Sequence, residues 1–112
     1  MARKKQTTAD RERLRELIEE ATVDCYGDEE QFMGLCNMIE EEVVVPFKAK
    51  VIGEAVTVTS LNAGNEGNSI WATCERNGKK HRVEITSLEW VKPLPEGFEW
   101  IEAYIAWREF NS

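Results

Sequence analysis

Residues 24 to 42 read DCYGDEEQFMGLCNMIEEE, and the rest of the chain is organised around this stretch. A front cluster of acidic residues opens it and a rear cluster closes it: the front is Asp24, Asp28, Glu29 and Glu30, and the rear is Glu40, Glu41 and Glu42. Carboxylates are expected at a helix N-terminus, where the helix dipole is positive and backbone N–H groups lack partners. At the C-terminus the dipole is negative, so the rear cluster costs roughly 0.3–1 kcal/mol per exposed charge. A bound cation would turn that cost into attraction.

The apolar residues between the two clusters have helical spacing. Phe32, Leu35, Cys36, Ile39 and Val43 follow at i, i+3, i+4, i+7 and i+11, which predicts one buried face of a helix. We expect Asp28 to be the N-cap residue and Gln31 its capping-box partner. On the polar line of this helix, Gly34 would allow another backbone to come close.

An earlier helix is predicted from about Thr8 to Val23. Its apolar line is Leu14, Leu17, Ile18, Ala21 and Cys25, again at helical spacing. Two amphipathic helices joined by a short turn are expected to form an antiparallel helical hairpin.

After Pro46 the apolar period changes from helical spacing to two. Alternating segments begin at Phe47, Val56, Ile70 and His81, the one from His81 includes Val83 and Ile85, and a last short one covers Leu88 to Val91. Asn77-Gly78 is a strong signal for a two-residue β-hairpin turn. Short strands linked by tight turns predict a small, strongly bent antiparallel sheet or an SH3-like barrel.

A final helix is predicted from Glu96 to Phe110, after Pro93 and Pro95. Phe98, Ile101 and Ile105 form one apolar line, with Trp100, Tyr104 and Trp107 beside it. So much apolar surface should close the core. The fold class is therefore α+β, with residues 1 to 7 as a flexible basic tail and residues 8 to 112 as a single domain.

Composition narrows the function classes. The 112 residues carry a net charge of -7, which argues against nucleic acid as the main partner and favours cations or basic proteins. With no signal peptide and no membrane-spanning run, we expect a cytoplasmic monomer that does not bind membranes. Three cysteines and a single histidine make a poor zinc or catalytic set, and no nucleophile motif is present, so we do not expect an enzyme.

The acidic clusters fit a hard cation. Calcium takes six to eight oxygen ligands, and a third oxygen-rich place is the loop at 62–68, which contains Glu66. Asp28 and Glu40 are twelve residues apart on one helix, or roughly 18 Å. There are therefore either two sites, or sites completed by sheet loops, with Glu66 able to join the rear cluster. The spacing does not match an EF-hand, whether the loop begins at Asp24 or at Asn62.

Other interpretations of these groups remain open. The front cluster could serve only to stabilise the helix N-terminus, and the rear cluster could be a run of solvent-exposed glutamates. The 62–68 loop could be an ordinary hairpin turn. The rival class of function is an interaction module, in which a small β-barrel with an acidic face docks a basic partner protein.

The sequence also resembles a known family, the small acidic, CcbP-like calcium-binding proteins of cyanobacteria and other bacteria. The resemblance runs from about Ile18 to Trp107. It is carried by the segments 23–30, 39–41, 45–49, 83–89 and 100–107, and by Gly34. Within them, Val45-Pro46-Phe47-Lys48-Ala49 is similar to the family's F-P-F-x-A motif. The 62–68 loop is less acidic than in the family.

The resemblance implies a calcium-binding protein without an EF-hand and with an α+β fold. Carried over by position, the family's acidic residues correspond to Asp24, Asp28, Glu29, Glu40 and Glu41. It further implies a role in controlling free calcium, which in filamentous cyanobacteria is tied to heterocyst differentiation.

Overall fold

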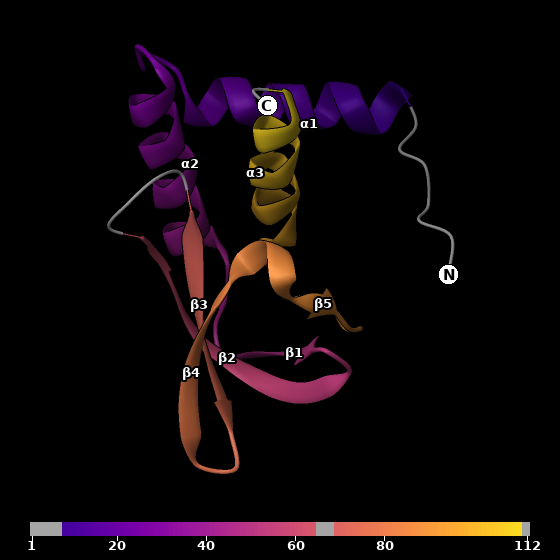
Figure 1. Cartoon of the computed structure of the whole chain (residues 1–112). Helices are drawn as coiled ribbons and strands as arrows, with labels where there is room; N and C mark the ends of the chain where they lie inside the picture. Colours follow the sequence, from indigo (N-terminus) through magenta and orange to yellow (C-terminus); the bar gives the residue numbers. More distant parts are fainter. Residues whose placement is uncertain (1–7, 65–68, 111–112) are drawn as a thin grey trace.

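In the part of the chain that the structure describes, the fold combines three α-helices with a five-stranded antiparallel sheet (Figure 1). A computed structural model describes residues 8–64 and 69–110. The elements are α1 (Thr8–Ala21), α2 (Asp28–Glu42), β1 (Phe47–Val51), β2 (Glu54–Ala63), β3 (Ile70–Arg76), β4 (Lys79–Glu84), the 3-10 helix η1 (Ile85–Ser87), β5 (Glu89–Trp90) and α3 (Phe98–Phe110). The strand order is β4-β3-β2-β1-β5 and the sheet is open. The predicted α+β class is confirmed. Of the two predicted β structures, an antiparallel sheet and an SH3-like barrel, the structure has the sheet.

The first two helices follow each other through a short turn, as predicted. In Figure 1, however, α1 lies across the ends of α2 and α3 instead of running antiparallel along α2. Gly34 makes the crossing possible, because a Cβ atom there would lie only 2.2 Å from the carbonyl oxygen of Ala21. The prediction that Gly34 lets another backbone come close is confirmed.

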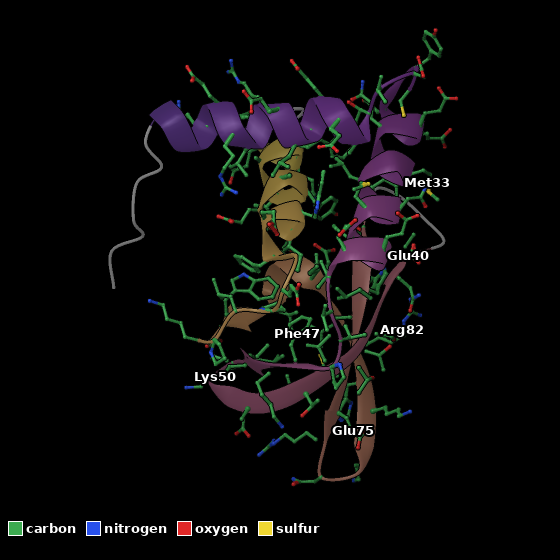
Figure 2. The ribbon with its side chains drawn as sticks, turned by 180° about the vertical axis from the view of Figure 1, so that it is seen from behind. Met33, Glu40, Phe47, Lys50, Glu75 and Arg82 are labelled. Carbon is green, nitrogen blue, oxygen red and sulfur yellow. The ribbon has the colours of Figure 1, made fainter. Side chains whose placement is uncertain are left out.

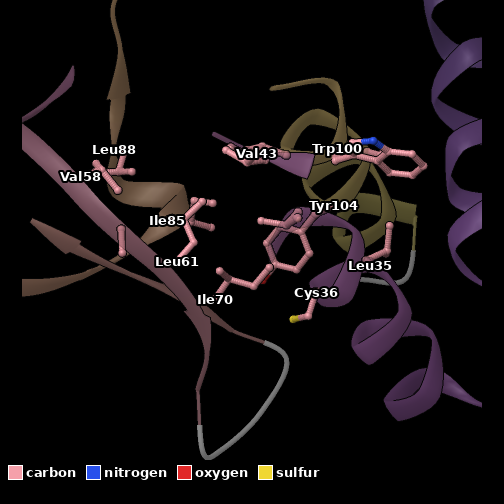
Figure 3. Packing of buried hydrophobic residues seen from close by; sticks show 14 of the residues in the cluster. Leu35, Cys36, Val43, Val58, Leu61, Ile70, Ile85, Leu88, Trp100 and Tyr104 are labelled. Atoms are coloured by element: carbon pink, nitrogen blue, oxygen red, sulfur yellow. The ribbon is translucent and has the colours of Figure 1, made fainter. Parts of the chain in front are cut away.

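The core lies between the sheet and helices α2 and α3 (Figure 3). Tyr104 of α3 is fully buried, with Leu35 of α2 on one side and Ile70 and Ile85 on the other. Both apolar lines predicted for the last helix contribute to this core, as Ile101 and Trp107 are buried as well. Their aromatic surface is core packing.

The β3–β4 hairpin extends away from the helices (Figure 1). Asn77 and Gly78 have φ angles of 53° and 75°, as a type I′ turn requires, so the predicted turn is confirmed. In β4 the side chains from Lys79 to Arg82 are exposed on both faces, because none of the described helices covers this end of the sheet (Figure 1).

Two local predictions were wrong. Ile85 was expected in a strand, but β4 ends at Glu84 and Ile85 begins η1. The N–H of Leu88 donates a 3.2 Å hydrogen bond to the carbonyl oxygen of Ile85. Asp28 was expected to be the N-cap of α2, but that residue is Gly27, and no side-chain cap bond is present there. Gln31, the expected capping-box partner, instead accepts a 2.9 Å hydrogen bond from the indole Nε1 of Trp107.

The three cysteines are free thiols. Cys36 and Cys74 are buried, whereas Cys25 lies beyond the end of α1 and is half-buried. None of the helices in the described part of the chain has both the length and the apolar character needed to cross a bilayer.

Candidate metal centre

The front cluster lies at the turn between α1 and α2. Asp24 is the last residue of the turn that follows α1 and has a left-handed φ of 64°. Asp28 and Glu29 are the first two residues of α2. All three side chains are exposed. Glu30 is occupied differently, because its carboxylate accepts a 2.5 Å hydrogen bond from the backbone N–H of Tyr26. The turn thus holds Glu30 and leaves Asp24, Asp28 and Glu29 facing solvent.

The rear cluster forms the last turn of α2, which contains no basic residue. Glu40, Glu41 and Glu42 are exposed, and Figure 2 shows Glu40 near the end of the helix that leads into the sheet. Burial, followed by the charge of Glu40, raises the pKa of the Cys36 thiol to about 12. Cys36 is therefore a neutral, buried core residue.

Three acidic residues outside the two clusters have basic partners. Glu54 pairs with Arg76, Glu102 with Arg13 at 3.6 Å, and Glu84 with Arg108 at 3.1 Å. In the described residues no such ion pair involves either cluster. Within the described chain, both clusters therefore lack the ion-pair partners that Glu54, Glu84 and Glu102 have.

The helix keeps the two clusters apart. Asp28 and Glu40 lie near opposite ends of α2, roughly 18 Å apart along its axis. Over residues 8–64 and 69–110, no three His, Cys, Asp or Glu side chains are close enough together to hold a metal ion. The donors are hard oxygens, which suits calcium, but in this conformation they are spread over solvent-facing surface and would have to turn toward an ion.

Glu66, the remaining predicted ligand, lies outside the described residues. The loop that contains it is flanked by a regular hairpin, in which Ala63 is opposite Ile70 and Gly64 N–H donates to the Ser69 carbonyl at 2.8 Å. The hairpin connection expected for this segment is therefore present at its described ends.

Sequence reasoning missed one acidic neighbour of the rear cluster. The carbonyl of Glu96 accepts a 2.9 Å hydrogen bond from the N–H of Val44, two residues after α2. Beside it, a Cβ atom at Gly97 would lie 2.1 Å from the carbonyl oxygen of Glu42. These contacts bring the exposed Glu96 next to the end of α2. Over fifty residues separate the two segments, so the only sequence signal was a glycine at the start of the last helix.

Comparison with known proteins identifies the class. A family model described as calcium binding, Calci_bind_CcbP, matches residues 15–108. This is a calcium-binding α+β protein, and the chain belongs to the CcbP family. The solved structure titled "The crystal structure of Anabaena CcbP" is similar, with a TM-score of 0.72 and 18% identity, and the match covers 96% of this chain and 95% of that one. No curated protein sequence matches the chain.

Proposed function

We propose that this protein buffers or senses cytoplasmic calcium through the carboxylates at the two ends of α2. The observation that carries the proposal is the rear cluster: three exposed carboxylates at the negative end of a helix with no basic residue in its last turn. Such an arrangement is unfavourable without a cation and favourable with one. Membership of a calcium-binding family supports calcium as that cation.

The proposed ligands form two sets. The front set is Asp24, Asp28 and Glu29, and the rear set is Glu40, Glu41 and Glu42. Glu66 is a further proposed ligand of the rear set. Consecutive residues of a helix point about 100° apart, since 3.6 residues make one turn. The three rear side chains cannot all face one ion from a rigid helix, so water or neighbouring segments would complete the coordination. Affinity should be modest, because separate groups must be ordered on binding.

Glu96 is the neighbouring residue best placed to supplement the rear set. Its backbone is bonded to Val44 at the exit of α2, and its side chain is exposed. A carboxylate from the segment before α3 would tie the end of α2 to that segment when calcium binds. Calcium bound by both segments would therefore stabilise the folded domain.

In cellular terms, we propose a non-catalytic role in calcium signalling, of the kind that links free calcium to cell differentiation in cyanobacteria. This part of the proposal rests on the family alone. It would have the protein take up calcium as its level rises and release it as the level falls. An acidic interaction module that docks a basic protein is the alternative, and it would not need calcium to act.

The ligand sets can be tested with three variants of equal charge change, titrated with calcium by calorimetry. Asp24→Asn/Asp28→Asn/Glu29→Gln removes the front set, and Glu40→Gln/Glu41→Gln/Glu42→Gln removes the rear set. Glu12→Gln/Glu16→Gln/Glu19→Gln is the matched control, since these residues are exposed on α1 and belong to neither set. The proposal expects each site variant to lose a binding event that the control keeps. Equal weakening in all three would mean that calcium only screens the overall negative charge.

A further inference from the structure

The β3–β4 hairpin has a charge opposite to that of the whole molecule. Residues 75–82 hold four Lys or Arg residues and one Glu, in a chain with a net charge of -7. Figure 1 shows the hairpin tip at the end of the molecule opposite α1. The molecule is 42 Å along its longest axis, several times the screening length of about 8 Å in physiological salt. The acidic helices therefore do not cancel the positive field of the hairpin tip.

The outer strand of this hairpin offers unpaired backbone groups. β4 is the last strand of the described sheet on that side. The two-residue turn makes Arg76 and Lys79 a hydrogen-bonded pair, and such pairs alternate with non-bonded ones along an antiparallel ladder. Lys80 and Arg82 fall at the non-bonded positions, so their N–H and C=O groups point away from β3 toward the open edge.

The side chains along this edge are positively charged and available. Lys79, Lys80 and Arg82 are exposed, and in the part of the chain that the structure describes none of them pairs with a carboxylate. Arg76 differs, because Glu54 already neutralises it. The core does not use Lys79 to Arg82, so packing does not explain the concentration of positive charge.

Arg82 is held in place on the outer face of the sheet. Its guanidinium lies over the ring of Trp71, 5.2 Å from the centroid. Trp71 in turn packs closely over Gly64, where a Cβ atom would lie 2.5 Å from the indole Nε1. A cation fixed in this way loses less freedom on meeting an anion than a mobile one.

We propose that the open edge of β4 binds an extended acidic segment of a partner protein as an added strand. The free groups of Lys80 and Arg82 would bond its backbone, and the side chains of Lys80 and Arg82, which lie on one face of the strand, would face its carboxylates. A second copy of this chain does not fit, because its acidic clusters lie on and beside a helix and cannot pair with a strand edge. Nucleic acid would meet the charges but would leave the backbone groups unused.

The test uses a fluorescent ten-residue peptide of alternating Glu and Thr, measured by anisotropy with the full chain. We expect saturable binding that weakens as salt rises from about 0.05 to 0.5 M. Lys80→Glu/Arg82→Glu should weaken binding at least about tenfold. Lys48→Glu/Lys50→Glu makes the same charge change on β1, which is flanked by strands on both sides, and should leave binding within about threefold. Circular dichroism checks that both variants are folded.

Hydrogen exchange on the same complex tests the edge itself. Bound peptide should slow exchange of the Lys80 and Arg82 amides, while the amides of Lys79 and His81, already bonded to β3, should change little. Equal loss of binding in the two variants would overturn the proposal. So would equally tight binding of an oligothymidine of the same charge, or peptide binding without protection of the two edge amides.

Discussion

Substituting Gly34 by alanine tests the contact that fixes how α1 crosses α2. The new Cβ atom would lie 2.2 Å from the Ala21 carbonyl oxygen, where ordinary contact begins near 3.4 Å. The obstacle is backbone, so it cannot rotate aside, and the two helices must separate by more than 1 Å. Overpacking of this kind costs about 1–3 kcal/mol. The gain in helix propensity from Gly to Ala is about 1 kcal/mol and opposes it.

The expected net effect is a destabilisation of up to about 2 kcal/mol and centred near about 1 kcal/mol, which is about 4 °C in melting temperature for a domain of this size. Urea unfolding and a thermal melt followed by circular dichroism would measure it. Asn37→Ala is the matched control, because Asn37 is exposed one turn further along α2. It should be neutral or slightly stabilising. If Gly34→Ala also stabilises the protein, α1 does not approach α2 at Gly34, and the position assigned to the front cluster is wrong.

Three further results are expected. In urea unfolding, Gly97→Ala should destabilise the protein more than Gly78→Ala. Both glycines have a positive φ, but of the two only Gly97 lies against a close atom, the carbonyl oxygen of Glu42. Equal losses of stability would contradict the close contact between Gly97 and the end of α2. Without calcium, neutralising Glu40, Glu41 and Glu42 should stabilise the protein by about 1–3 kcal/mol at low salt, whereas neutralising Asp28 and Glu29 should destabilise it; the same sign for both would contradict the dipole argument. Hydrogen bonds from Thr86 and Arg108 lower the pKa of Glu84 below its usual 4.5, so wild type should melt above Glu84→Gln at neutral pH. That difference should shrink as pH falls below about 4.5, and one that does not vary with pH would mean that the charge of Glu84 plays no part.

Local patterns predicted the elements of the fold well. The helical spacing of Phe32, Leu35 and Ile39 gave a helix with that face buried. The Asn77-Gly78 pair gave a type I′ hairpin, since few other residues tolerate two successive positive φ angles. The close approach at Gly34 was also predictable, because a glycine inside a helix lowers its stability unless something needs the space.

Long-range contacts were beyond sequence reasoning. The crossing of α1 over α2 depends on how three helices share one core, which the period of each helix does not encode. Glu96 approaches α2 through a bond to Val44, and no local motif joins those segments. The cap of α2 was mistaken because Asp28 is a good N-cap residue by type, whereas the chain turns at Gly27 and uses Glu30 to hold the N–H of Tyr26.

The candidate site was predictable in composition and not in geometry. Carboxylates at the negative end of a helix can be recognised from sequence, and in the described residues none of them forms an ion pair. Whether they converge depends on side-chain rotation and on segments far away in the chain. The described residues bring no three of them together, so ordering on binding is part of the proposed mechanism.

The most direct test of the central claim is a calorimetric calcium titration of the chelator-treated protein, with magnesium as the control and thermal melts alongside. We predict saturable heat with calcium in the micromolar to millimolar range and little with magnesium, which gives up its water reluctantly. At a calcium concentration about a hundred times the Kd, stability should rise by about 2.7 kcal/mol. No heat and no change in melting temperature at millimolar calcium would contradict the account.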